Sequence, residues 1–586
     1  MMSFKTKKIK SLLFFLFVFL FSLIISFRLH SGKKLYTWES EIWADRAGYY
    51  MYLPATFFYH FDASKFPKDI DIRTGLGFNI DPKRNAVVTQ YYYGEALLLS
   101  PFFLQAHFIQ QAFHMNEEGG FSGFYIQAMN LAAIIYLLLG LYFLGKFLEK
   151  YFPSASVLLT LVTIFLGTNL FFYTVEDSLM SHVYSFFGAS LFLFAMKSFL
   201  DDQKKYKYFL LMIVTFSLIV IIRPTNALLG FCFFFWDLKS KRNFLERIRM
   251  MIIPRYIFPF IFVLVLFCLP QLIYWEYAHG SYIYPKYAIE FSNWHQPRFA
   301  AVWFSTLNGL FIYSPLVMVF VIGALWMSLR KNTNGMFVLV MFLTVSYVAA
   351  SLKCWYYGCG FGHRAFIEYY PLLGFPVAFL SDRLLINTTK SIKIPVGIGI
   401  IFFFFLNIAL TVSGDKCNEG SVWDWDQFSR EMYKTGLIPV SLKSDNYTND
   451  FENQQICGGF DTTRLVFHSR DYSVRVKPGE KGFSLYSIYL RDLKKKEALH
   501  LQVSFWVYGS GQDSTALSAE MKDKNKVLFT KEYYPVRMKP DPENWQIIQQ
   551  EIQIPFISGR DTFFEIVLLN KVSAAFYIDD VKVRFR

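Results

Sequence analysis

Two short acidic segments hold the carboxylates of this sequence that are placed to transfer a proton. Asp45 follows an apolar N-terminal segment, and Glu176-Asp177 separates two later apolar segments. A carboxylate beside a reacting hydroxyl group can accept its proton, which is the role of a general base. We therefore expect Asp45, Glu176 and Asp177 to be catalytic residues. The structural alternative for Asp45 is a salt bridge with Arg46 or another loop cation.

The pair Glu176-Asp177 has a second interpretation of its own. Acids at the start of a helix are often solvated groups that interact favourably with the helix dipole. Together with Asp45, the pair could instead orient an acceptor or hold a divalent cation. Spacing alone leaves both interpretations open, and the sequence requires no other cofactor.

Cations in apolar surroundings form the second half of the candidate site. Arg223 lies within an apolar stretch, and His363 and Arg364 close a loop that begins at Lys353. Because a planar guanidinium group matches two phosphate oxygens, we expect Arg223 and Arg364 to bind the phosphate of a donor. We expect Lys353 and His363 to take part in the same phosphate-binding site. The alternatives are an arginine that snorkels to the interface at Arg223, and a helical pair between Arg364 and Glu368.

Aromatic residues accompany both groups of charges. Trp43 and Tyr49 flank Asp45, and Tyr284 and Trp294 lie in a later loop rich in tyrosine. Aromatic belts at membrane interfaces explain many such residues. The faces of sugars also pack on aromatic rings, so we expect these four residues to contact an acceptor or a sugar.

The composition excludes a soluble protein of ordinary type. Of 586 residues, 54% are hydrophobic and 67 are Phe, and the mean hydropathy is +0.29. The charge of +14 comes from short basic runs beside apolar segments, which is typical of topology signals and not of a nucleic-acid surface. No phosphate-binding loop, dinucleotide fingerprint or Gly-x-Ser-x-Gly elbow occurs, so soluble nucleotide-sugar chemistry has no support.

The elements that must position these side chains are membrane helices. A helix needs about 20 apolar residues to cross a bilayer, which predicts about eleven spans in residues 1–413. They are expected near 12–27, 124–145, 156–173, 181–198, 208–222, 225–237, 256–275, 309–328, 336–351, 368–385 and 394–413. The segments 208–222 and 225–237 form either a hairpin or one broken helix. Because basic loops face the cytoplasm, we expect a cytoplasmic N-terminus and an extracytoplasmic C-terminal domain in a bacterial-type inner membrane.

An additional apolar segment, Gly94 to Phe113, would make one crossing too many. We therefore expect it to lie along the outer interface as a juxtamembrane helix interrupted by Pro101, within a long outer loop of residues 28–123.

From about residue 414 onward the long apolar runs stop and charges and turns appear. Alternating apolar and polar residues in 501–507, 548–554 and 578–583 predict half-buried strands, and several such strands predict a β-sandwich domain over 414–586. Cys417 and Cys457 both fall in this domain, where an oxidising compartment would let them form a disulfide. A second bridge between Cys354 and Cys359 is the weaker expectation, whereas Cys232 and Cys268 are expected to be isolated thiols.

The order of these features resembles the GT-C superfamily of membrane glycosyltransferases, in particular the protein O-mannosyltransferases and lipid A aminoarabinose transferases. The resemblance covers most of residues 1–413 and depends on a first span, Asp45 in a long outer loop, a juxtamembrane helix at 91–103 and the acids Glu176-Asp177. It implies a polyprenyl-phosphate sugar as donor, transfer on the outer face with inversion, and Asp45 as the first-loop catalytic aspartate. Arg46 stands where a second acid would follow. The C-terminal domain looks similar to jelly-roll carbohydrate-binding modules.

The sequence therefore predicts a glycosyltransferase with a sugar, lipid or protein acceptor. A transporter or flippase for a lipid-linked saccharide is the rival hypothesis, and it would favour two related halves and broken helices at the membrane midplane. A membrane anchor for a sugar-binding domain, without activity, is the third.

Overall fold

The structure is a computed structural model of the chain. It describes residues 4–37, 40–115, 118–282, 294–358 and 360–413, and beyond them mainly the strands of the C-terminal region. Tyr284, Cys359, Cys417 and Cys457 lie outside the described residues. Cys354 is disulfide-bonded, and Cys232 and Cys268 are free thiols.

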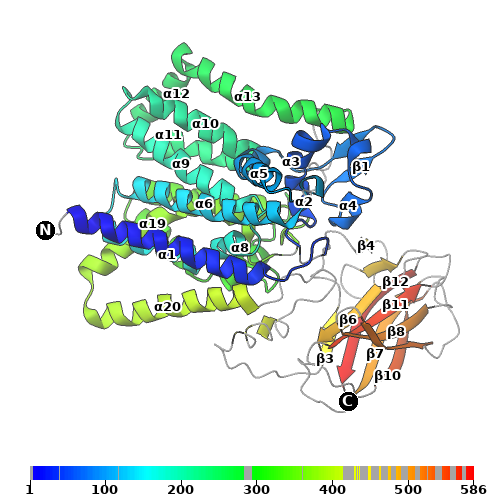
Figure 1. Ribbon diagram of the computed structural model, residues 1–586. Coiled ribbons are helices and arrows are strands. Elements are labelled where there is room, and N and C mark those ends of the chain that lie inside the picture. Colours follow the sequence, from blue (N-terminus) through cyan, green and yellow to red (C-terminus); the bar gives the residue numbers. More distant parts are fainter. Residues whose placement is uncertain are drawn as a thin grey trace. The chain divides into compact units, whose positions relative to one another are not determined.

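The chain divides into two compact units, which are described separately (Figure 1). The first comprises Met1–Ser305, Gly309–Leu352 and Phe361–Val412, and the second comprises Thr306–Asn308, Lys353–Gly360 and Ser413–Arg586.

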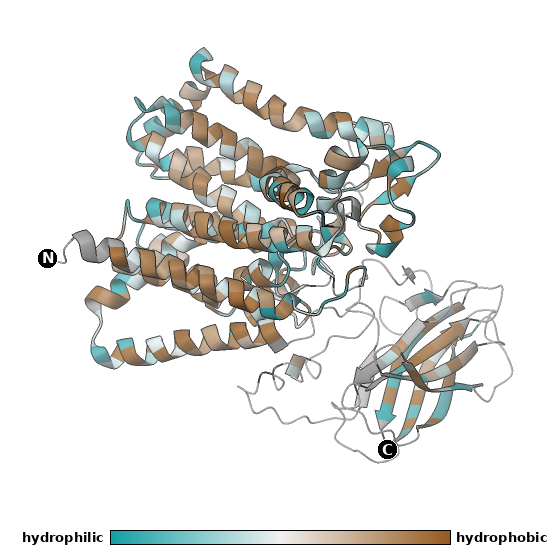
Figure 2. Ribbon diagram, viewed as in Figure 1, coloured by the Kyte–Doolittle hydropathy of each residue, from teal (hydrophilic) through white to brown (hydrophobic). Residues whose placement is uncertain are grey.

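The first unit is a bundle of helices. Six described helices are long and apolar enough to cross a membrane. They are α1 (Phe4–His30), α6 (Gly123–Leu148), α9 (His182–Asp201), α13 (Pro254–His279), α18 (Thr333–Ala350) and α20 (Lys390–Ser413). The ribbons of α1, α6, α13 and α20 are hydrophobic along most of their lengths in Figure 2. The expected number of about eleven spans is therefore not confirmed by length and composition.

Helices also occupy the other segments in which spans were expected, but they are shorter, interrupted or less apolar. They are α7 (Ser154–Gly167) with α8 (Leu170–Val175), α10 (Tyr206–Ile222), η4 (Pro224–Gly230) with α11 (Phe231–Phe235), α16 (Leu310–Tyr313) with α17 (Leu316–Leu329), and α19 (Tyr370–Asn387). The apolar segment after residue 93 forms α5 (Gly94–Ala112), one helix that contains Pro101 without ending there.

The chain reverses at Arg223, between α10 and η4. Asn226 donates a hydrogen bond from Nδ2 to the Ile219 carbonyl oxygen at 2.9 Å. Farther from the turn, a Cβ on Gly230 would lie 2.9 Å from the ring of Phe216. In each pair, the two contacting residues lie at about the same distance in sequence before and after Arg223. The two segments therefore pack as a hairpin with Arg223 at its turn.

The second unit contains two antiparallel sheets. The six-stranded sheet has the order β10-β7-β12-β5-β4, with β3 also paired to β12, and the four-stranded sheet has the order β6-β11-β8-β9. The strands are β3 (Asn446–Asn449), β4 (Asp461–Thr463), β5 (Ser473–Val476), β6 (Phe483–Tyr489), β7 (Leu499–Tyr508), β8 (Thr515–Asp523), β9 (Lys526–Tyr533), β10 (Gln546–Ile554), β11 (Thr562–Asn570) and β12 (Phe576–Phe585).

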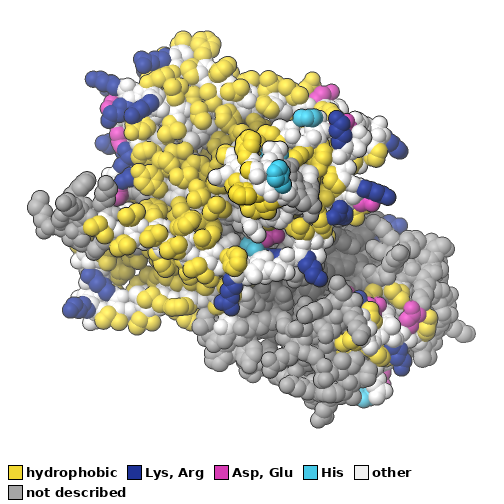
Figure 3. All heavy atoms as spheres, viewed as in Figure 1, with side chains coloured by type: hydrophobic (Ala, Val, Ile, Leu, Met, Phe, Trp, Pro, Cys, Tyr) yellow, Lys and Arg dark blue, Asp and Glu magenta, His cyan; other side chains and the backbone are white. Residues whose placement is uncertain are grey.

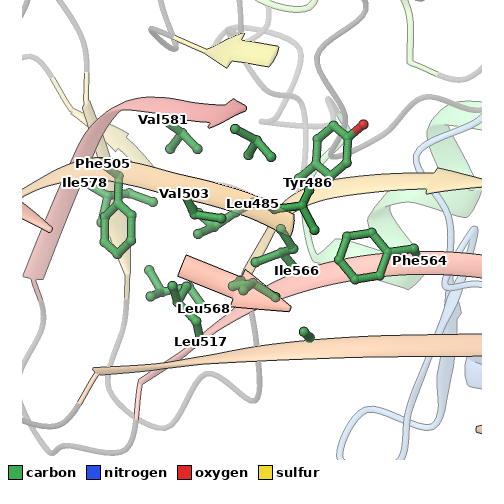
Figure 4. Close-up of a cluster of buried hydrophobic side chains, with 14 of the residues drawn as sticks. Leu485, Tyr486, Val503, Phe505, Leu517, Phe564, Ile566, Leu568, Ile578 and Val581 are labelled. Atoms are coloured by element: carbon green, nitrogen blue, oxygen red, sulfur yellow. The ribbon is translucent and has the colours of Figure 1, made fainter. Parts of the chain in front are cut away.

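One hydrophobic core takes side chains from both sheets, so the sheets share a buried face (Figure 4). In β7, Val503 and Phe505 are buried, and the intervening Ser504 is partly exposed. This is the alternation that the sequence predicts. In β12 the register shifts between Asp579 and Lys582, and this irregularity keeps the following strand residues facing the core.

Candidate active site

Asp45 is the first residue of α2 (Asp45–Tyr50), and two side chains hold its carboxylate. Arg364 Nη2 donates to Oδ2 at 2.8 Å, and the Tyr91 hydroxyl donates to Oδ1 at 2.5 Å. Partial burial raises the pKa of Asp45, but the Arg364 charge and the Tyr91 hydrogen bond outweigh it, so the pKa lies below its usual value. The carboxylate is therefore ionised at neutral pH, and each oxygen keeps a further acceptor site.

The position of Tyr91 depends on a close approach of the chain at Gly48. A Cβ on Gly48 would lie 2.2 Å from the Tyr91 ring, so only glycine lets the ring pack over α2. The ring also packs on Tyr49, with centroids 4.5 Å apart. Gln90 donates from Nε2 to the Tyr91 hydroxyl oxygen at 2.9 Å. The hydroxyl is thus oriented to donate its proton to Asp45.

The acids Glu176-Asp177 attach the long loop after α1 to the rest of the bundle. Arg46 Nη1 contacts Asp177 Oδ1 at 2.7 Å, and Lys33 Nζ contacts Glu176 Oε1 at 2.9 Å. The suggested pair of Asp45 with Arg46 therefore does not form, and the loop cation that pairs with Asp45 is Arg364. Among the described residues, no group of three or more His, Cys, Asp and Glu side chains is placed to hold a metal ion.

Arg223 belongs to a second buried set of charges. Its Nε lies 2.8 Å from Glu368 Oε1, and the same oxygen lies 3.1 Å from His182 Nδ1. The suggested helical pair of Arg364 with Glu368 is therefore wrong, because Glu368 pairs with Arg223 and Arg364 turns to Asp45. Arg223 Nη1 also donates to Ser181 Oγ at 3.3 Å, and Ser181 donates to the Tyr49 hydroxyl oxygen at 3.2 Å. Tyr49 thereby links the two sets of charges.

Sequence reasoning missed a further carboxyl group, Glu95, in the first turn of α5. It is completely buried, and neither carboxyl oxygen has a hydrogen-bond partner among the described residues. Burial raises the pKa of Glu95 well above its usual value, although the Arg223 charge opposes this. Glu95 is thus a neutral acid beside the ionised groups. An acid within an apolar helical segment was the signal that could have identified it.

Among the carboxylates of these ion pairs, Asp45 is the most exposed. Its side chain is 38% exposed, whereas that of Glu368 is 1% exposed and those of Glu176 and Asp177 are 16% and 12% exposed. The ionised group that a substrate can reach most easily is therefore Asp45.

The remaining predicted residues have different locations. Trp43 packs over Gly75 in the loop after α1, and His363 is buried with its ring against Phe366. Trp294 is exposed and contacts Tyr347 of α18, with ring centroids 5.5 Å apart. Lys353 groups with the second unit. The described structure therefore brings together Asp45, Tyr49, Glu176, Asp177, Arg223 and Arg364, but it shows no contact between Trp294 and that cluster.

No protein-family model and no curated protein matches this sequence. Three solved structures illustrate what it resembles. The oligosaccharyltransferase of Archaeoglobus fulgidus in its apo form is 12% identical, with a TM-score of 0.42 over 73% of this chain and 60% of that chain. Arabinosyltransferase EmbB from Mycobacterium smegmatis is 10% identical, with a TM-score of 0.35 over 97% of this chain and 64% of that chain. The CBM22-1 xylan-binding domain from Paenibacillus barcinonensis Xyn10C is 19% identical, with a TM-score of 0.18 over 24% of this chain and 95% of that domain.

The chain spans 60% of the length of the oligosaccharyltransferase that it matches. Two of the three structures are, by name, an oligosaccharyltransferase and an arabinosyltransferase. Every TM-score is below 0.5, so the function of this chain has to be argued from its own residues.

Proposed function

We propose that this chain is an integral membrane glycosyltransferase that moves a sugar from a polyprenyl-phosphate donor to an acceptor hydroxyl group, with Asp45 as the general base. One observation carries the proposal. Asp45 is an ionised carboxylate that is partly exposed while its two partners fix its orientation. A base must be ionised, reachable and held in place, and Asp45 meets all three requirements.

The proposed reaction is a single displacement at the anomeric carbon. The acceptor oxygen forms a bond to that carbon while the bond from the carbon to the phosphate oxygen breaks. The acceptor proton passes to Asp45, and the polyprenyl phosphate leaves with the bonding electrons. Attack from the face opposite the leaving group inverts the anomeric configuration. Holding both substrates in line removes an entropic cost from the barrier.

Cations beside Asp45 would stabilise the charge that grows on the leaving phosphate. Arg364 lies closest, since it already contacts the Asp45 carboxylate at 2.8 Å. Arg223 is linked to Asp45 more indirectly, through Ser181 and Tyr49. Preorganised cations aimed at a developing negative charge can supply a large part of an enzyme's rate enhancement. We assign Arg364 as the main phosphate-binding residue and Arg223 as a supporting one.

In this proposal the bilayer holds the prenyl tail, and the Asp45 cluster faces the extracytoplasmic side of a bacterial-type inner membrane. The N-terminus is then cytoplasmic and the β-sheet unit extracytoplasmic. The acceptor is a glycan, a lipid or a protein.

The test is a transfer assay with the purified full-length protein and a radiolabelled polyprenyl-phosphate sugar. We expect release of polyprenyl phosphate together with a labelled acceptor, and a loss of at least about 100-fold in Asp45→Asn. Equal amounts of membrane-inserted wild type and variant, assayed at a temperature at which both remain folded, are the control. Movement of the donor across the membrane without cleavage would instead indicate a transporter, and neither activity would indicate an anchor. Full activity in Asp45→Asn would overturn the assignment of the base.

A further inference from the structure

The helix α12 (Lys241–Ile252) lies between the apolar helices α11 and α13, at the end of the bundle remote from Asp45 (Figure 1). Its position follows from α10, which leads from Tyr206 to the turn at Arg223. The Tyr206 hydroxyl donates to the carbonyl oxygen of Arg255, just after α12, at 2.8 Å. Because α10 has 17 residues, about 26 Å of helix separate this contact from Arg223.

One side of α12 is fixed to the bundle. Arg247 Nη1 donates to the carbonyl oxygens of Phe233, Phe234 and Trp236 at 2.9, 3.2 and 2.6 Å, and thereby caps the end of α11. Phe244 packs on Phe235, with ring centroids 5.3 Å apart. The Arg247 guanidinium group therefore makes its hydrogen bonds within the protein. The residues on the opposite side of α12 are exposed.

The opposite side of α12 mixes cations with apolar residues along one stripe. Arg242, Leu245, Arg249 and Ile252 follow one another at helical spacing. Arg242 pairs with Glu246 at 2.9 Å, but its side chain is still 89% exposed. The two apolar residues are 42% and 69% exposed. If α12 lay in water, Leu245 and Ile252 would be exposed to an unfavourable solvent. If it lay in the hydrocarbon of the bilayer, the charged arginines would be. The boundary between lipid headgroups and acyl chains satisfies both.

The charge around α12 is strongly positive. Residues 239–255 contain six cations and a single acid, Glu246. The cations are Lys239, Lys241, Arg242, Arg247, Arg249 and Arg255. Figure 3 shows Lys and Arg side chains gathered along this end of the bundle, beside a broad hydrophobic surface. A zwitterionic headgroup offers no net charge to such a surface, whereas an anionic one does.

We propose that α12 lies in the headgroup layer of the leaflet remote from Asp45 and binds anionic phospholipids there. The phosphate groups contact Lys241, Arg242 and Arg249, and the acyl chains contact Leu245 and Ile252. This binding surface is separate from the candidate active site, and the proposal stands whether or not the protein transfers a sugar.

The test compares the purified full-length protein in nanodiscs of phosphatidylcholine alone and of phosphatidylcholine with phosphatidylglycerol. The lipid retained after extraction into detergent is counted by native mass spectrometry. We expect the wild type to retain phosphatidylglycerol at least tenfold more than phosphatidylcholine, and the combined variant Lys241→Gln, Arg242→Gln, Arg249→Gln to lose this preference. Rising salt should weaken the preference of the wild type, which needs no variant to fold.

The matched control removes three exposed cations from the outer loop at the other end of the bundle, as Lys65→Gln, Lys68→Gln, Lys83→Gln. It should keep the preference for phosphatidylglycerol. Equal retention of both lipids by the wild type, or an equal loss in both triple variants, would overturn the proposal. So would stabilisation of the protein by inorganic phosphate alone to the same extent as by phosphatidylglycerol, because the ligand would then be a soluble anion.

Discussion

The cluster around Asp45 and the segment that contains α12 differ in the balance of their charges. At the Asp45 end, carboxylates and cations form matched pairs, such as Asp45 with Arg364, Arg46 with Asp177, and Arg223 with Glu368. Along residues 239–255, by contrast, six cations accompany a single acid, and most of the cations are exposed. Matched and largely buried charges fix the shape of a site, whereas an excess of exposed charge attracts a partner from outside.

This difference in charge balance also suits the two regions to different functions. A balanced cluster can hold one carboxylate in a defined position without collapsing onto its neighbours, which is what a general base requires. An unbalanced surface has no such precision, but it suits a fluid layer of lipid headgroups. Three predictions test this comparison.

The largest expected effect comes from removing one charge of the balanced end. In Glu368→Gln the Arg223 guanidinium loses its partner at 2.8 Å, in a pair whose carboxylate is 1% exposed. An uncompensated buried charge costs about 3–5 kcal/mol, so the melting temperature in detergent should fall markedly. Differential scanning fluorimetry of the purified variant measures the change.

The double variant Glu368→Gln, Arg223→Gln is the control for this prediction. It removes both charges and should recover part of the lost stability, since no charge remains buried alone. Two variants of equal stability would show that the pair does not stabilise the fold, and the comparison between the two ends would then lose its basis.

A smaller effect is expected at Glu95, which adds no negative charge to the cluster around Asp45 as long as it stays protonated. Its pKa is raised in the folded protein, so folding binds a proton that the unfolded chain has released. Stability is complete below the unfolded pKa and is lost as the pH rises towards the folded pKa, at up to about 1.4 kcal/mol per pH unit. Glu95→Gln does not titrate. The melting temperature of the wild type should therefore fall relative to that of the variant between pH 5 and pH 7. Parallel curves over that range would show that Glu95 is ionised.

The smallest effect is expected from Tyr91→Phe, which removes a hydrogen bond but no charge. The Tyr91 hydroxyl lowers the pKa of Asp45, so its loss should raise that pKa and move the acidic limb of the pH profile of sugar transfer upward by roughly one unit. Activity should fall about tenfold as Asp45 loses its orientation. Tyr93→Phe is the matched control, because the Tyr93 hydroxyl donates to the Phe267 carbonyl oxygen instead. An unchanged pH profile in Tyr91→Phe would remove Tyr91 from the site.

Features that depend on residues close together along the chain could be predicted from the sequence alone. The apolar runs indicated the helices, and the alternation around Val503 and Phe505 indicated β7, because local periodicity reports which face of an element is buried. Asp45 was proposed as a catalytic residue from its position just beyond the first apolar segment, and that role stays a prediction. The irregularity in β12 between Asp579 and Lys582 escaped prediction, since a shift of register depends on the neighbouring strands.

The partners in the ion pairs, by contrast, could be identified only from the tertiary structure. The partner of Asp45 is Arg364, 319 positions away, and not the adjacent Arg46. Glu368 pairs with Arg223 instead of the residue four positions before it, and Glu95 became important only when α5 buried it. The physical reason is that the free energy of an ion pair depends on distance and burial in space, which are set by how the helices pack and not by spacing along the chain.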